Sequence, residues 1–282
     1  MSENLHKIHL TSFQVIILGF AGVILSGALL LMLPWASVKG AVTPFHEALF
    51  TATSAVCVTG LVVQDTGSYW SSFGQAVILI LIQTGGFGVV TVAAAVSMMS
   101  GRKISLMQRS TMQNAISAPK VGGIVRLTKF ILKGTFLIEG MGALLLLPVF
   151  CHDFGWKGIW MAVFHSVSAF CNAGFDILGR KGHLYPSIVG YADNILVNGV
   201  IIGLIIIGGI GFLTWEDICE YKWKFKNYRM QSKLILATTA CLIILPACFF
   251  FFADFQHLPV KSRLLASVFQ SVTPRTAGFN TV

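Results

Sequence analysis

Five long apolar stretches are the feature that most limits what this chain of 282 residues can fold into. They occupy residues 12–34, 75–99, 128–150, 195–213 and 234–253. Each approaches the ~20 apolar residues that a helix needs to cross a lipid bilayer. With 55% hydrophobic and only 11% charged residues, the chain has too little polar surface for a soluble protein. We therefore expect an all-α integral membrane protein, retaining its first span and having no soluble domain.

The distribution of positive charge predicts the orientation in the membrane. Thirteen of the 20 Lys and Arg residues lie in the N-terminal tail and in two regions between spans, residues 101–133 and 216–233. The positive-inside rule then places the N-terminus and both regions in the cytoplasm. The formal charge of +9 is thus a topology signal, and we expect no nucleic-acid partner. The longer region is either a topology determinant alone or also a docking surface for a cytosolic partner.

The polar residues offer no motif for catalysis or for a resident metal. His46 and Glu47 do not extend to a zinc-binding HExxH sequence, and no Ser/His/Asp or Cys/His set has motif spacing. The cysteines form no CxxC pair, and we interpret them as buried thiols. They are Cys57, Cys151, Cys171, Cys219, Cys241 and Cys248. The sequence predicts neither an enzyme nor a cofactor in this chain.

A repeated unit organises the chain. Three spans carry similar Leu-rich or Ile-rich runs before Pro34, Pro148 and Pro246, and each leads to a short segment that ends in a glycine turn. The spacing from Pro34 to Gly60 and from Pro148 to Gly174 is 26 residues, and the third copy is longer by six. Glycine runs at 85–88 and 208–211 follow the first two turns, where small residues are typical of close helix packing.

The repeat predicts three units separated by two loops. The first pore unit covers 1–100, a basic cytoplasmic loop 101–127, the second unit 128–215, a cytoplasmic loop 216–232, and the third unit 233–282. The third unit stops soon after its glycine turn, so we expect the natural protein to carry the rest of that unit and at least one more.

The short segments are too short to span a bilayer and are expected to be re-entrant. Backbone without helical hydrogen bonds is tolerated at membrane depth only where protein or water surrounds it, so three equivalent turns indicate a shared, water-filled axis. Backbone carbonyls around such an axis can replace the water shell of a cation, as in potassium filters. Glycine reaches the required backbone angles, and the C-terminal ends of short helices favour a cation.

These motifs resemble the Trk/Ktr/HKT superfamily of potassium transporters, and the bacterial Ktr membrane subunit most closely. The resemblance rests on the sequences at 55–61, 170–176 and 273–280. It implies four units around one pore, a homodimer in the plasma membrane, and a cytosolic ring of nucleotide-binding regulatory subunits. It further implies potassium uptake that sodium activates. In sodium-preferring plant relatives a serine replaces the first filter glycine, and the corresponding residue here is Gly60.

The resemblance and the repeat assign candidate site residues. The predicted filter comprises Val58, Thr59, Gly60 and Leu61; Asn172, Ala173, Gly174 and Phe175; and Thr276, Ala277, Gly278 and Phe279. Asn172 either contributes its backbone carbonyl to the filter, with no role for its side chain, or braces the turn through its side-chain amide. Asp176 would lie at the outer mouth, attracting cations or pairing with a loop residue. Arg275 is expected to point behind the filter toward a carboxylate or carbonyls, and Pro274 to stop the helix before it.

Two buried polar residues and two other protein classes complete the expectations. Glu139 lies in an apolar span, where it is either functional or a hydrogen-bonded packing residue, and His165 is expected to be packed. A secondary carrier for another cation or small solute, with a site at broken helices, is the alternative function, although its units are expected to be inverted relative to one another. An intramembrane enzyme would need converging polar residues, and only Glu139 approaches that.

Overall fold

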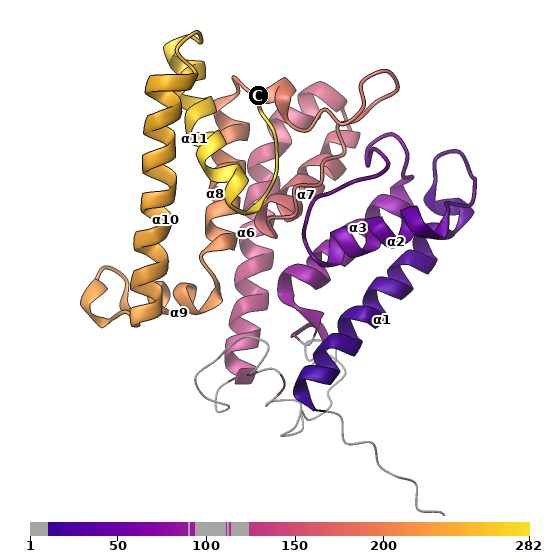
Figure 1. The fold of residues 1–282 in the computed structure, drawn as a ribbon, viewed down its shortest axis with the longest axis horizontal. Helices are drawn as coiled ribbons and strands as arrows, with labels where there is room; N and C mark the ends of the chain where they lie inside the picture. Colours follow the sequence, from indigo (N-terminus) through magenta and orange to yellow (C-terminus); the bar gives the residue numbers. More distant parts are fainter. Residues whose placement is uncertain (1–10, 90, 94–110, 112, 114–123) are drawn as a thin grey trace, which may run out of the picture.

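The computed structural model describes residues 11–89, 91–93, 111, 113 and 124–282. The described residues form helices and no β-strand, which confirms the expected all-α class (Figure 1). The main helices are α1 (Ser12–Met32), α2 (Phe45–Val56), α3 (Ser72–Phe87), α6 (Ile124–Phe154), α7 (Lys157–Phe170), α8 (Ile195–Gly209), α9 (Phe212–Tyr221), α10 (Met230–Phe249) and α11 (Val260–Thr276).

Several of these helices are suited to a bilayer. Three described helices are long and apolar enough to cross it, namely Phe13–Met32, Val125–Phe154 and Met230–Asp254. The pair α8 and α9 also passes by composition, but its two parts are bent by 96°. α1 begins at a capping box, in which the Thr11 hydroxyl accepts from the Gln14 N–H and the Gln14 amide oxygen accepts from the Thr11 N–H. The chain is a multi-pass membrane protein.

Two of the five expected spans are not continuous helices. α3 ends at Phe87, where Gly88 has a φ of 79°, and α8 ends at Gly209 shortly before Gly211 with a φ of 83°. A positive φ is incompatible with α-helix, so the glycine runs that allow close packing also break the helices. The expected spans at 75–99 and 195–213 are therefore interrupted by these glycines, and residues 90 and 94–99 of the first lie outside the described part.

Pro274 does not stop its helix. α11 continues through Pro274 to Thr276, which contradicts the prediction. The proline lies in the last turn, where only one backbone hydrogen bond is lost. The Thr273 carbonyl then closes the helix by accepting from the N–H groups of Ala277 and Gly278, at 3.0 and 3.1 Å.

Each helix that leads into a glycine turn packs between two other helices. α2 lies against α1 and α3, α7 against α6 and α8, and α11 against α10 and α8. After α11 the chain turns back toward the end of the molecule from which that helix came (Figure 1). Small side chains on α2, such as Ala48, Ala52 and Ala55, are fully buried and let it sit close to its neighbours. The packing places the C-terminal ends of the short helices inside the molecule.

The cysteines are free, but the prediction that they are buried was wrong for four of them. Cys57, Cys219, Cys241 and Cys248 are exposed in this chain, and Cys151 and Cys171 are half-buried. The exposed thiols lie on surfaces that no other described element covers.

Candidate functional site

The three predicted turns share one backbone conformation at their glycines. Gly60, Gly174 and Gly278 have φ values of 74°, 69° and 79°. These angles lie in the left-handed region, which costs other residues roughly 1–2 kcal/mol. Each glycine follows the end of a short helix, at α2, α7 and α11 respectively.

The turns also contact one another in succession. A Cβ atom added to Gly60 would lie 2.5 Å from the carbonyl oxygen of Ala173, and one added to Gly174 would lie 2.0 Å from that of Ala277. Both distances are far inside van der Waals contact. The first turn thus packs on the second and the second on the third, and glycine is required for space as well as for conformation.

Equivalent glycines in α3 and α8 brace the short helices from the side. A Cβ atom on Gly85 would lie 2.1 Å from the carbonyl oxygen of Val56 at the end of α2. One on Gly208 would lie 1.8 Å from that of Phe170 at the end of α7. The interpretation that the glycine runs serve close helix packing is confirmed.

Backbone and hydroxyl bonds hold each turn to the helix before it. The N–H groups of Thr59 and Ala173 donate to the carbonyls of Ser54 and Ser168, at 2.9 and 2.7 Å. In the third turn this role falls to Gly278, because the glycine lies five positions after the accepting Thr273, whereas Gly174 lies six after Ser168. That difference explains why Val58 and Asn172 have positive φ values, of 56° and 58°, whereas the equivalent residue of the third turn has not.

In two of the turns, hydroxyl side chains hold the residue that directly follows the glycine. Ser168 Oγ donates to the Phe175 carbonyl at 2.7 Å, and Thr273 Oγ1 donates to the Phe279 carbonyl at 2.6 Å. In the first turn Ser54 and Thr59 bond through their hydroxyls at 2.8 Å. Phe175 and Phe279 are almost fully buried, whereas Leu61 is exposed in this chain.

The side chain of Asn172 braces two turns. Its Nδ2 donates to the Phe170 carbonyl at 3.3 Å, and its Oδ1 accepts from Thr276 Oγ1 at 2.9 Å. The bracing alternative is therefore the one that the geometry favours, and the bond links the second turn to the third. Its donor and acceptor ends are both used, which fixes the amide orientation.

Arg275 points toward α8. A Cβ atom on Gly209 would lie 3.1 Å from its Nη2, so the guanidinium occupies the space that the glycine leaves. The residue before the second turn, Cys171, stands in the same relation to Gly86, at 2.6 Å from Sγ. Within the described part of the chain, the buried Nη1 of Arg275 has no hydrogen-bond partner, so the expected carboxylate or carbonyl is not found for that atom.

Asp176 lies in the connection that follows the second turn, outside the spanning helices. Its Oδ1 accepts from the Leu178 N–H at 3.2 Å. Burial, aided by the negative charge of nearby Asp65, raises the pKa of Asp176 to about 6. Among the described residues it makes no ion pair, so the geometry does not support the alternative of pairing with a loop residue.

Asp65 is a site residue that the sequence reasoning missed. Its carboxylate is 4% exposed and accepts from the N–H groups of Ser68 and Tyr185, at 2.7 and 2.8 Å. The Tyr185 hydroxyl in turn donates to the Val63 carbonyl at 2.9 Å. Asp65 thereby ties the connections after the first and second turns together. An aspartate two residues before Gly67 is a turn signal that indicated only local structure.

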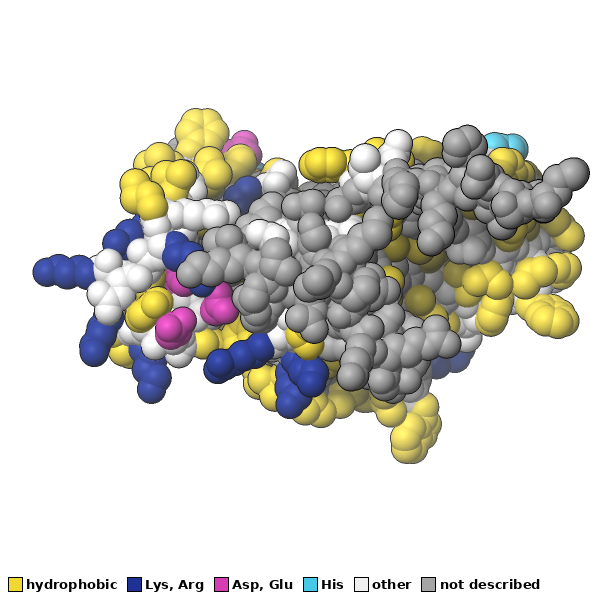
Figure 2. Space-filling view, turned by 90° about the horizontal axis from the view of Figure 1, so that it is seen from below, with side chains coloured by type: hydrophobic (Ala, Val, Ile, Leu, Met, Phe, Trp, Pro, Cys, Tyr) yellow, Lys and Arg dark blue, Asp and Glu magenta, His cyan; other side chains and the backbone are white. Residues whose placement is uncertain are grey.

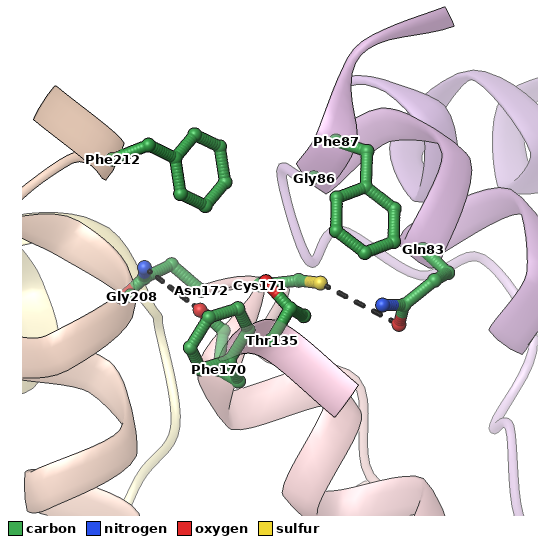
Figure 3. A pocket seen from close by; sticks show the side chains of 9 residues that line it. All are labelled: Gln83, Gly86, Phe87, Thr135, Phe170, Cys171, Asn172, Gly208 and Phe212. Carbon is green, nitrogen blue, oxygen red and sulfur yellow. Dashed lines mark hydrogen bonds between the residues drawn. The ribbon is translucent and has the colours of Figure 1, made fainter. Parts of the chain in front are cut away.

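A small cavity of about 50 Å³ lies against the second turn (Figure 3). Asn172 and Cys171 line it, and Phe87 and Phe212 face it from the ends of α3 and α9 (Figure 3). The same two phenylalanines also line a larger cavity of about 350 Å³ between the two broken helices, which Gln231 of α10 borders. The two cavities therefore adjoin the same pair of phenylalanines, one on the side of the second turn and one on the side of the helix breaks.

Glu139 connects two helices beside this cavity. Gln83 Nε2 donates to both of its carboxylate oxygens, at 2.9 and 3.1 Å, and Glu139 is 4% exposed. The geometry favours the alternative of a hydrogen-bonded packing residue, which joins α3 to α6. His165 is fully buried, with its ring 5.2 Å from that of Phe150 and its Nδ1 2.8 Å from the Met161 carbonyl, as expected for a packed histidine.

Residues 9–282 match the protein family described as TrkH, cation transport protein. The chain belongs to this family. Members of the TrkH family are cation transporters and not enzymes, which agrees with the absence of a catalytic motif in the sequence.

Curated relatives extend the comparison. The chain is 40% identical over 288 residues to the potassium/sodium uptake protein NtpJ of Enterococcus hirae, covering 100% of this chain and 62% of the relative. It is 39% identical over 283 residues to the Ktr system potassium uptake protein B of Bacillus subtilis, with 98% and 61% covered. The protein of the same description from Vibrio alginolyticus is 35% identical over 279 residues, with 95% and 59% covered. The TrkH chain thus spans about three fifths of the length of these relatives.

Proposed function

We propose that this chain forms part of a potassium uptake pathway across the plasma membrane. The repeated units would surround one pore, and the re-entrant turns at 58–61, 172–175 and 276–279 would form a carbonyl-lined selectivity filter. Potassium is the transported ion and not a resident cofactor. The family membership and the potassium uptake activity named for two kinds of relative support this proposal.

One observation carries the proposal most directly, namely the succession of contacts between the turns. Three segments far apart in sequence meet here, because the first two place their glycines against the next turn, at Gly60 with Ala173 and at Gly174 with Ala277. Helix ends that served no shared purpose would not need to pack so closely that neither of these two positions has room for a Cβ atom. A ring of backbone around a shared axis has that reason, because the carbonyls must approach closely enough to coordinate one ion.

Sodium activation and regulation are further parts of the proposal. One relative is named a potassium/sodium uptake protein, which supports a role for sodium as activator or second ion. Others are named as components of Ktr systems, which supports a partner subunit; we propose a cytosolic nucleotide-binding ring beneath a homodimer. The N-terminus would be cytoplasmic by the positive-inside rule.

Rubidium uptake tests the proposal. The complete reading frame that encodes this chain would be expressed in bacteria lacking their own potassium uptake systems, with and without sodium and with the cytosolic partner present. We expect rubidium uptake that potassium inhibits and sodium stimulates. A membrane-inserted protein that takes up no rubidium under any of these conditions would overturn the proposal.

A carrier is a second candidate because one specific observation favours it. The 96° bend between α8 and α9, and the break after Phe87, resemble the discontinuous helices of secondary carriers. A carrier exchanges substrate across the membrane and shows counterflow, so preloaded cold rubidium would accelerate uptake of labelled rubidium. A pore shows a linear flux along the electrochemical gradient and no such acceleration by coupled exchange in voltage-clamped vesicles.

A further inference from the structure

The turn between α9 and α10 alternates aromatic and positive side chains. Residues 221–229 read Tyr-Lys-Trp-Lys-Phe-Lys-Asn-Tyr-Arg, and we call this segment the α9–α10 turn. A short 3₁₀ helix, Phe225–Asn227, lies within it. Nothing in the proposed ion pathway uses these side chains, so their exposure requires another explanation.

A buried carboxylate fixes the base of the α9–α10 turn. Asp217 is fully buried, and its Oδ2 accepts from the Arg229 N–H at 3.0 Å and from Ser232 Oγ at 2.6 Å. The Arg229 guanidinium pairs with Glu216 at 2.5 Å and with Asp217 at 3.4 Å. The charge of Arg229 is thus neutralised within the protein, and the turn is held in one conformation.

The aromatic side chains divide into an inner and an outer set. Tyr228 is 5% exposed, donates its hydroxyl to the Lys222 carbonyl, and packs its ring 5.2 Å from that of Phe225. Trp223, in contrast, is 88% exposed and Phe225 is 56% exposed. A rigid turn therefore presents an indole and part of a phenyl ring outward. Exposure of this apolar surface to water is unfavourable, and a partner that covered it would remove the unfavourable contact.

Three lysines surround these rings and keep their charge free. Lys222, Lys224 and Lys226 are exposed, and none of them enters the ion pairs found within the described residues. Seen from below, Lys and Arg side chains project from the edge of the molecule beside hydrophobic side chains (Figure 2). The surface combines free positive charge with exposed aromatic area.

The position of the turn identifies its partner. α10 begins at Met230, and the apolar span Met230–Asp254 starts there, with none of its most apolar window buried in this chain. The α9–α10 turn therefore lies at the level where lipid hydrocarbon gives way to headgroups. Trp and Tyr concentrate at that level, and Lys beside a span attracts anionic headgroups.

We propose that the α9–α10 turn is a binding site for anionic phospholipid headgroups of the adjacent leaflet, which the positive-inside rule makes the cytoplasmic one. Trp223 and Phe225 enter the interfacial region, and the three lysines contact the phosphodiester groups. The site anchors the base of α10 and does not depend on which ion the protein carries.

The direct test is lipid binding by the complete protein in detergent micelles. Fluorescently labelled phosphatidylglycerol is titrated in mixed micelles, and its anisotropy gives the affinity. The triple variant Lys222→Gln, Lys224→Gln, Lys226→Gln is expected to bind at least about tenfold more weakly, since each lysine near an anionic surface contributes roughly a factor of five. The control triple Lys39→Gln, Lys157→Gln, Lys181→Gln removes the same charge from exposed positions elsewhere and is expected to bind as the parent does.

Two further measurements keep the outcome decisive. In vesicles that contain brominated phospholipid, the Trp223→Phe variant is expected to lose part of the tryptophan fluorescence that the bromine quenches. In a separate titration, labelled phosphatidylcholine is expected to bind the parent and the triple variant alike. Equal phosphatidylglycerol affinity in the triple variant and the parent would overturn the proposal. So would a triple variant that loses capture of the cytosolic partner subunit while keeping its phosphatidylglycerol affinity, because the turn would then be a protein docking surface.

Discussion

Replacing Gly174 by serine tests the reasoning about the turns most sharply. The new side chain meets two obstacles that the structure separates. The φ of 69° costs a non-glycine residue roughly 1–2 kcal/mol. The Cβ atom would also lie 2.0 Å from the Ala277 carbonyl oxygen, so that the third turn must retreat by about an ångström, and overpacking of this kind costs about 1–3 kcal/mol. Together they amount to about 2–5 kcal/mol, concentrated at the proposed ion pathway.

Gly182→Ser is the matched control. Gly182 has a φ of 87°, but nothing lies within 4 Å of its added Cβ atom, so this variant carries the backbone strain alone. Gly60→Ser, with its contact at 2.5 Å, is expected to fall between the two. The order of severity therefore follows the closeness of the neighbouring carbonyl.

The assay is the initial rate of rubidium uptake, normalised to the amount of protein in the membrane, together with the ratio of rubidium to sodium uptake. We expect Gly174→Ser to lose at least about tenfold in rate, since 1.4 kcal/mol corresponds to one factor of ten, and to lower the ratio. Gly182→Ser is expected to stay within about twofold of the parent. Equal losses in both variants, or an unchanged ratio in Gly174→Ser, would show that the close contact between the turns has no part in selectivity.

Three other changes have expected outcomes. Glu139→Leu deprives the half-buried Gln83 amide of its acceptor and should lower stability by about 1–3 kcal/mol. Glu139→Gln keeps an acceptor and should stay near the parent. Thermal unfolding in detergent measures both variants, and equal losses would contradict the bond. Asp65→Ala should speed hydrogen exchange at the amides of Ser68 and Tyr185, which lose their acceptor. The amide of Leu196, bonded to Asn194, serves as an internal reference that should not change. Burial raises the pKa of Asp176 to about 6, so its carboxylate is ionised above that pH and neutral below it. External acidification from pH 7 to pH 5 should therefore reduce rubidium uptake, and Asp176→Asn should abolish that pH dependence. An identical pH profile in the variant would exclude this carboxylate as the source of the pH dependence.

Much of the candidate site could be located from the sequence because its demands are local. A left-handed backbone position favours glycine, which is visible in the sequence, and the shared register of Gly60, Gly174 and Gly278 located all three turns. The helix breaks were missed at Gly88 and Gly211, because hydropathy averages over a window and does not register one positive φ. The run past Pro274 was missed because a proline in the last helical turn costs little.

The sequence by itself determined that this protein is helical and enters a membrane, and it predicted a threefold repeat of short helix and glycine turn, since apolar length and glycine placement are properties of the chain. Only the tertiary structure decided which atoms meet. The contact of Gly174 with Ala277, the bond of Asn172 to Thr276 and the tie of Asp65 to Tyr185 join segments separated by most of a unit or more. Such contacts depend on how the helices pack side by side, and packing is decided by the shapes of all the neighbours at once and not by any local run of residues.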